Sequence, residues 1–288
     1  LITNISTSNA AGISSLRTNI GEMEGWGTEI NLGVKPIKTE DFGWNLNLGF
    51  TKNYSELVKL TDQLSETSLG GYTGFAEVFA VEGEQFPTLK GTGFARDDQG
   101  RVIIDPTTGN PQQSSELVTF GNVTPDYIVN LNTSFRYKGF TLSATMDYRT
   151  GHVFFSNTHS NLIWSGHLNE SAQGGRGGFI YPNSAVETTP GSGEYVANTN
   201  VMSGGTTAGS YINFWNNMRN IGENSVLDAT AFKLRELSLR YDVNPELLEK
   251  TFLTSVSVNA VARNLFTVLP EENKGYADPE ANFSAGNT

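Results

Sequence analysis

Alternation of apolar and polar residues is the feature that most constrains this chain. Between residues 127 and 137, large apolar side chains alternate with Asn, Ser and Arg, and between 140 and 148 they alternate with Thr, Ser and Asp. Successive side chains of a β-strand point to opposite faces, so this period of two predicts two strands with one apolar face each. Lys138 and Gly139 separate them, which predicts a tight hairpin in an all-β fold.

Two further hairpins show the same period. Residues 28–35 and 44–51 alternate in this way and are joined by a short connection. Residues 229–241 and 256–262 form the third pair, and the apolar set of the first strand shifts by one position near Arg235, which predicts a β-bulge. The connection inside this pair begins with an Asn and a Pro, which predicts a helical turn.

Short and long connections alternate along the chain. The intervals 55–123, 155–228 and 264–288 are rich in Gly, Asn, Ser and Thr and are predicted to be loops. Two of them are about seventy residues long, against roughly 4–6 in compact domains. Outer-membrane barrels have short periplasmic turns and long outer loops. With a first strand at 1–5, the pattern predicts about seven strands of a transmembrane antiparallel β-barrel, which needs at least one more strand after Thr288 to close with an even number.

Composition supports this interpretation and excludes several functions. The chain has 19 Lys and Arg against 30 Asp and Glu, a net charge of −11, which argues against binding to nucleic acid. It has no Cys, which excludes thiol nucleophiles, redox dithiols and zinc ribbons. The polar faces of the predicted strands carry mainly Asn, Ser and Thr, which suits a water-filled lumen better than bulk solvent. The sequence contains no run of 18 apolar residues, so no membrane-spanning helix is predicted.

Catalytic and metal-binding patterns are weak. There is no G-x-S-x-G, no phosphate-binding loop and no carboxylate pair in a catalytic motif, so the chain is predicted not to be an enzyme. His152, His159 and His167 are spaced in a way that does not favour a shared metal. No cofactor is predicted, although four acidic residues of the last interval offer oxygen ligands that calcium could use. These residues are Glu271, Glu272, Asp278 and Glu280.

Aromatic residues of the long intervals are candidates for binding. They stand among Asn, Arg and Gly, a mixture that stacks on sugars or peptide side chains and hydrogen-bonds their edges. For any single aromatic residue, packing of the loops against one another is the favoured alternative. The residues predicted to contact substrate or a partner are Trp164, Arg176, Tyr181, Tyr211, Trp215 and Arg219.

Six short segments, in the expected order, resemble SusC/RagA-type TonB-dependent outer-membrane receptors. The first is similar to N-x-G-x-x-x-N-x-G-x-E, with Gly25 where Asn is common, and the fourth is similar to the F-x-K-L-R-E strand. The last is similar to G-Y-D-P-E, with Ala277 inserted. The segments are 19–29, 137–140, 149–151, 232–239, 263–266 and 275–280.

The resemblance implies a location, a fold and a function. Such receptors lie in the bacterial outer membrane and hold an N-terminal plug inside a barrel of about 22 strands. Residues 1–288 resemble the C-terminal portion of the barrel, without the plug and the final strand. The resemblance implies import of an oligosaccharide or oligopeptide with a SusD-like surface lipoprotein, and with TonB acting through the N-terminal part. It also places Lys233, Arg235 and Glu236 against the plug.

A secreted all-β module that binds glycans or acts as an adhesin is the alternative, and a loop-rich extracellular hydrolase is another. The apolar faces of the 127–137 and 140–148 strands distinguish the first from a barrel. A membrane barrel leaves them as a continuous outward band that contacts lipid, whereas a soluble module buries them against a second sheet.

Overall fold

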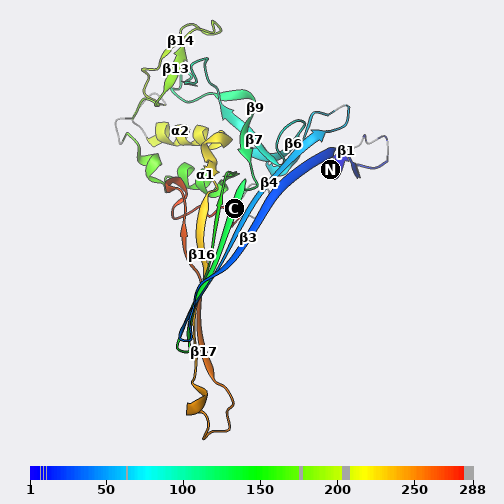
Figure 1. Cartoon of the computed structure of the whole chain (residues 1–288). Helices are drawn as coiled ribbons and strands as arrows, with labels where there is room; N and C mark the ends of the chain where they lie inside the picture. The colour runs from blue at the N-terminus through cyan, green and yellow to red at the C-terminus, as the bar shows by residue number, and fades with distance from the viewer. Residues whose placement is uncertain are drawn as a thin grey trace.

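A six-stranded antiparallel sheet, which we name the main sheet, forms the centre of the computed structural model. Its strand order is β17-β16-β11-β10-β4-β3. The strands are β3 (Glu22–Lys38), β4 (Phe42–Lys59), β10 (Tyr127–Tyr137), β11 (Phe140–Thr150), β16 (Ala231–Asp242) and β17 (Ser257–Val268). Figure 1 shows a long twisted ribbon with most of the remaining chain gathered at one end. The described residues are 1–6, 8, 10, 12–62, 64–174, 178–202 and 208–281.

The three predicted hairpins are all present, and the all-β, antiparallel fold class is confirmed. A shorter hairpin precedes them, in which β1 (Ile2–Ser6) pairs with β2 (Ser15–Asn19) close to the start of β3. No helix in the described part of the chain is both long and apolar enough to cross a membrane.

Local sequence explains the hairpin geometry. Lys138 and Gly139 have φ angles of 42° and 86°, and two consecutive positive values are typical of the two-residue turn that matches strand twist. In β16 the register shifts around Arg235 against both neighbouring strands, which confirms the predicted bulge. The predicted helical turn is η6 (Pro245–Leu247), where the Asn244 side chain accepts a hydrogen bond from the backbone N of Glu246 at 3.1 Å.

The register of the main sheet separates its side chains into an apolar and a polar face. One row that crosses all six strands on the apolar face consists of Leu32, Leu48, Leu131, Met146, Leu234 and Phe266. The adjacent row on the polar face consists of Asn31, Gly49, Asn130, Asp147, Lys233 and Thr267. The bulge at Arg235 keeps the two faces aligned across strands of unequal residue count.

Two long connections, residues 60–126 and 151–230, fold at one end of the main sheet into a unit that we name the cap. The sequence predicted loops here, but the connections have secondary structure of their own. One sheet has the order β5-β6-β7-β9, with β5 (Glu66–Tyr72), β6 (Ala76–Val81), β7 (Thr88–Phe94) and β9 (Gln113–Asn122). A second sheet consists of β8 (Val102–Ile103), β13 (Ser184–Glu187) and β14 (Tyr195–Ala197). A third consists of β12 (Val153–Phe155) and β15 (Val226–Asp228).

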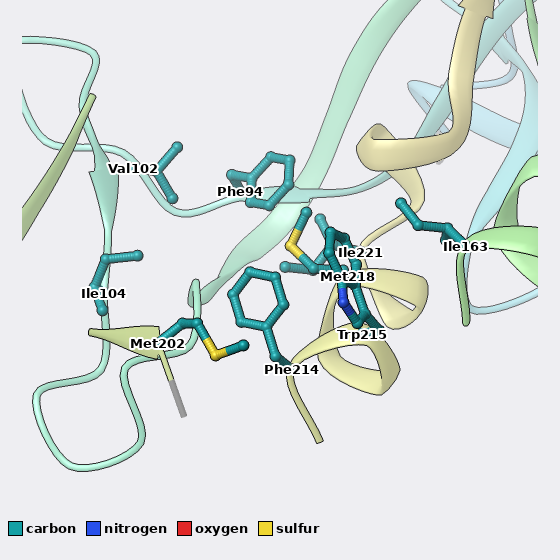
Figure 2. Packing of buried hydrophobic residues seen from close by; sticks show 9 residues of the cluster. All are labelled: Phe94, Val102, Ile104, Ile163, Met202, Phe214, Trp215, Met218 and Ile221. Atoms are coloured by element: carbon teal, nitrogen blue, oxygen red, sulfur yellow. The ribbon is translucent and has the colours of Figure 1, made fainter. Parts of the chain in front are cut away.

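Two helices hold the cap together. Helix α1 (Asn157–Trp164) begins after Ser156, whose hydroxyl accepts a hydrogen bond from the backbone N of His159 at 3.1 Å. Helix α2 (Ala208–Asn220) carries large apolar residues on one side. The 3-10 turns η2 (Asn169–Ala172) and η5 (Gly222–Ser225) follow α1 and α2. The largest core cluster of the cap, shown in Figure 2, consists of Phe94, Val102, Ile104, Ile163, Met202, Phe214, Trp215, Met218 and Ile221.

Candidate functional site

The apolar face of the main sheet has no covering layer among the described residues. Every large apolar side chain of the β10–β11 hairpin on this face is exposed or half-buried, including Tyr137 at 52% and Phe140 at 48% exposure. In the described part of the chain, β10 and β11 are hydrogen-bonded only to each other, to β4 and to β16, all within the main sheet. This is the outcome expected of a membrane barrel rather than of a soluble sandwich.

Aromatic residues mark both ends of this apolar face. At the end with the tight turns, Phe42, Tyr137, Phe140 and Tyr241 lie next to one another across four strands, and the rings of the last two are 4.5 Å apart. At the cap end, the rings of Phe50 and Tyr127 are 6.1 Å apart. Paired girdles of aromatic residues are typical of the two interfaces of a bilayer.

The polar face carries only uncharged side chains around one hollow on β3, β4 and β10. This hollow has a volume of about 240 Å³. Its polar lining consists of Asn31, Asn47, Thr51, Asn130 and Asn132. Amide side chains donate and accept hydrogen bonds without charge, which fits a wet lumen wall.

Charged residues gather at the cap end of the polar face, on β11 and β16. Lys233 and Asp147 are each only 6% exposed, so both are buried charges. Lys233 contacts the segment 270–281, which follows β17, contains η7 (Glu271–Asn273) and is here named the strap. The members of this ionic cluster are Asp147, Arg149, Lys233, Arg235, Asp278 and Glu280.

The contacts of the ionic cluster are close and multiple. Lys233 Nζ donates to both carboxylate oxygens of Asp278 at 2.7 Å and to Oε2 of Glu280 at 2.9 Å. Arg235 forms two hydrogen bonds to Asp147 and two to Glu280, while Arg149 Nη1 lies 3.0 Å from Oε1 of Glu280. Hydrogen bonds from Arg235, and then from Lys233, lower the pKa of Glu280 to about 2, so its carboxylate is charged near neutral pH.

Lys233, Arg235 and Glu236 were predicted to face the plug. In the structure, all three have partners within this chain. Lys233 and Arg235 belong to the ionic cluster, and Glu236 accepts a hydrogen bond from Nε of Arg263 at 3.0 Å. A plug contact for these residues stays a prediction. The ionic cluster was not predicted, because Lys233 and Asp278 are 45 positions apart and no local pattern links them.

The residues considered for calcium do not converge on one point. Asp278 and Glu280 face cations, Glu271 pairs with Lys274, and Glu272 is exposed. Within the described ranges, no group of three or more His, Cys, Asp or Glu side chains is arranged to hold a metal. Calcium binding stays an untested expectation for these carboxylates.

The histidines are likewise apart. His159 is buried, with Nδ1 3.0 Å from the hydroxyl of Ser225, and its ring stacks on Tyr276 of the strap with centroids 5.9 Å apart. His167 contacts Ser165 instead.

The predicted binding residues fall into two groups in the cap. Tyr181, Tyr211 and Trp215 pack in the core cluster, and Trp215 is only 6% exposed. Trp164 and Arg219 meet at the surface, where Trp164 is 44% exposed and the Arg219 guanidinium lies 4.6 Å from the centroid of its ring. Arg176 lies outside the described residues.

Helix α2 carries the signal that sequence reasoning missed. Tyr211, Phe214, Trp215 and Met218 have the spacing of one helical face, and Figure 2 shows the last three pointing from α2 towards Phe94. That periodicity would have assigned Trp215 to the interior.

Comparisons with known proteins support the resemblance of the motifs. No protein-family model matches the chain. TonB-dependent receptor P3 of Formosa agariphila is 25% identical over 298 residues, which cover 96% of this chain and 27% of that protein. TonB-dependent receptor P39 of the same organism is 24% identical, with 92% and 28% covered. TonB-dependent receptor SusC of Bacteroides thetaiotaomicron is 24% identical, with 64% and 19% covered.

Solved structures agree on the fold. The RagAB peptide transporter superposes with a TM-score of 0.66 at 18% identity, covering 100% of this chain and 30% of that chain. The RagAB peptide importer in the open-open state gives 0.64 at 17% identity, with 100% and 29% covered. The chain thus spans only about three tenths, or less, of the length of these relatives. The predicted resemblance to SusC/RagA-type receptors is confirmed, and with it the bacterial outer membrane as the location.

Proposed function

We propose that this chain supplies barrel wall and outer loops to a TonB-dependent importer of an oligosaccharide or oligopeptide, which works with a SusD-like surface lipoprotein. The uncovered apolar face of the main sheet is the observation that carries the proposal. A transporter needs no catalytic group, and the relatives are receptors and transporters rather than enzymes.

The dimensions of the apolar face support a membrane-spanning role. Strand β10 has 11 residues, and its aromatic ends, Tyr127 and Tyr137, are ten residue steps apart. At about 3.4 Å per residue this is roughly 34 Å along the strand. A strand tilted by about 40° would then cover roughly 26 Å of bilayer, close to the apolar band of about 25 Å in outer-membrane barrels.

The secreted module and the hydrolase both conflict with this face. A soluble protein with six strands of outward Leu, Phe, Tyr and Val would expose an apolar patch far larger than the few hundred Å² that monomers usually tolerate. In a bilayer the patch contacts lipid chains instead of water, so the free-energy cost of exposing it disappears. The same observation therefore favours the importer over both alternatives.

The partner and substrate classes come from the relatives. RagAB is named a peptide transporter, which supports an oligopeptide. The resemblance to SusC keeps an oligosaccharide as the other candidate and a SusD-like lipoprotein as the partner. On the cap, the exposed Trp164 and the half-buried Arg219 offer a flat ring and a cation to either ligand.

Substitution of one lipid-facing residue tests the proposal. Leu131 lies midway along β10 on the apolar face. Leu131→Arg in the complete receptor should cost about 2–4 kcal/mol, because a guanidinium would sit at the bilayer midplane. We expect a clear loss of folded, heat-modifiable receptor in isolated outer membranes.

Asn130→Arg is the matched control. Asn130 directly precedes Leu131 in β10, but its side chain points to the polar face and is exposed. It should leave the amount of folded receptor near the wild-type level. Equal amounts of folded receptor for both variants and wild type would show that the apolar face does not contact lipid.

A further inference from the structure

We infer, on the basis of the proposed transport function, that the strap lies inside the mouth of the barrel, where it narrows the path into the lumen. The ionic cluster holds it there. The strap thereby belongs to the wall of the substrate path rather than to the outer surface.

The face of the sheet that the strap contacts carries the first step. Asp147 and Lys233 are paired across β11 and β16, and both belong to the polar row. Their neighbours in sequence, Tyr148 and Phe232, point to the opposite, apolar face. Because the apolar face meets lipid in the proposed barrel, the strap crosses the lumen side.

Contacts with the cap fix the other side of the strap. Asn273 is fully buried, and its Nδ2 donates to the backbone oxygen of Asp228 at 2.6 Å. Ala277, at 1% exposure, packs with Phe154 and Leu227. The strap is therefore held between the cap and the polar face, and Figure 1 draws it in red beside α1 and the upper part of β16.

Charge balance explains why the strap stays in this position. Three cations of the main sheet face one carboxylate of the sheet and two of the strap. Withdrawal of the strap would leave Lys233, Arg235 and Arg149 with Asp147 as their only acidic partner in the cluster. Release of the strap would break the charge-assisted hydrogen bonds from Lys233 and Arg235 to its carboxylates, so release is opposed.

Thiol labelling by reagents of two sizes tests the position of the strap. The chain has no Cys, so a single one can be placed in it, after replacement of any cysteine elsewhere in the receptor. Glu272→Cys puts the thiol on an exposed position of the strap, and Ser192→Cys puts it on the exposed hairpin between β13 and β14. Intact cells are treated with a small methanethiosulfonate or with a maleimide on a 5-kDa polyethylene glycol.

We expect the small reagent to label both positions. The large reagent should label Glu272→Cys at least tenfold more slowly than Ser192→Cys. Equal rates with the large reagent would overturn the inference, because the strap would then lie outside the mouth.

Variants of the ionic cluster test what holds the strap. Lys233→Met and, as a milder change, Glu280→Gln should raise the rate of large-reagent labelling at Glu272→Cys towards that at Ser192→Cys. Arg263→Gln is the matched control, since it removes an exposed ion pair with Glu236 without touching the strap. Unchanged rates in both cluster variants, with folded receptor present, would overturn the holding role.

These rates are read without any substrate. They report the place of the strap even in a receptor whose transported nutrient is unknown. Failure of the proposed membrane location would be seen separately, in the Leu131→Arg and Asn130→Arg pair.

Discussion

Trp164 and Trp215 show how two aromatic residues of one cap differ in their surroundings. Trp215 packs edge-on against Phe214, with ring centroids 4.9 Å apart and planes at 87°, and is almost completely buried. Trp164 ends α1 with nearly half its surface exposed and a guanidinium over its ring. Burial thus assigns a packing role to the first and leaves the second accessible to a ligand.

Alanine substitutions should separate these roles. Trp215→Ala empties a closed core and should destabilise the cap by about 3–5 kcal/mol. We expect proteases added to intact cells to cleave the cap of this variant much faster than that of the wild type. Trp164→Ala should keep wild-type protease resistance and reduce uptake of a labelled oligopeptide or oligosaccharide pool severalfold. Fast cleavage of the Trp164→Ala cap would instead assign Trp164 to packing.

At the level of elements, the sequence predicted the strands that keep a period of two. The three hairpins, the bulge at Arg235 and the turn after Asn244 follow from alternation and from local caps. The cap elements lack this signal. Strand β6 (Ala76–Val81) is buried on one face and carries the buried Phe79 between half-buried residues on the other, so apolar residues stand on both faces, and α1 has only eight residues.

Only part of the candidate site was predicted, because only part of it lies in strands with a local sequence signal. Lys233 and Arg235 stand out in sequence as charges within a strand, but their partners in the strap lie far along the chain. Pairing across such a distance depends on how the cap folds back, which no local pattern encodes.

Two glycines with the same backbone conformation allow a test of the turn in the β10–β11 hairpin. Gly139 and Gly74 both have φ 86°, but a Cβ at Gly139 would lie 2.9 Å from the backbone oxygen of Asp242, whereas Gly74 has open space. Both Ala variants carry a left-handed strain of about 1–2 kcal/mol. Gly139→Ala adds a clash with the neighbouring turn.

We therefore expect Gly139→Ala to lower the temperature at which the folded receptor loses its compact mobility on SDS gels. Gly74→Ala should lower it less. Equal shifts would show that conformation alone, without the contact to Asp242, determines the cost.

For the whole molecule, the free edges of the main sheet matter most. Strands β3 and β17 each pair on one side only within the described residues. An unpaired edge beside an apolar face is unstable both in lipid and in water, because its backbone groups lack partners and invite pairing with other chains.

Residues 1–288 produced alone in detergent should therefore form mixed oligomers, while the complete receptor should not self-associate through this sheet. Size-exclusion chromatography with light scattering distinguishes the two results. A monodisperse monomer of the isolated residues with a native-like β spectrum would contradict this expectation.

The shared core of the cap limits how the outer loops of such receptors can be exchanged. Phe94, Val102 and Ile104 come from one long connection, and Phe214 and Met218 come from the next. If one connection were transplanted into a receptor of different selectivity, its core residues would have to pack against a connection of the recipient with which they do not match. Engineering of new selectivity in this frame is therefore a task for both connections and the strap together, since the loops are not modular.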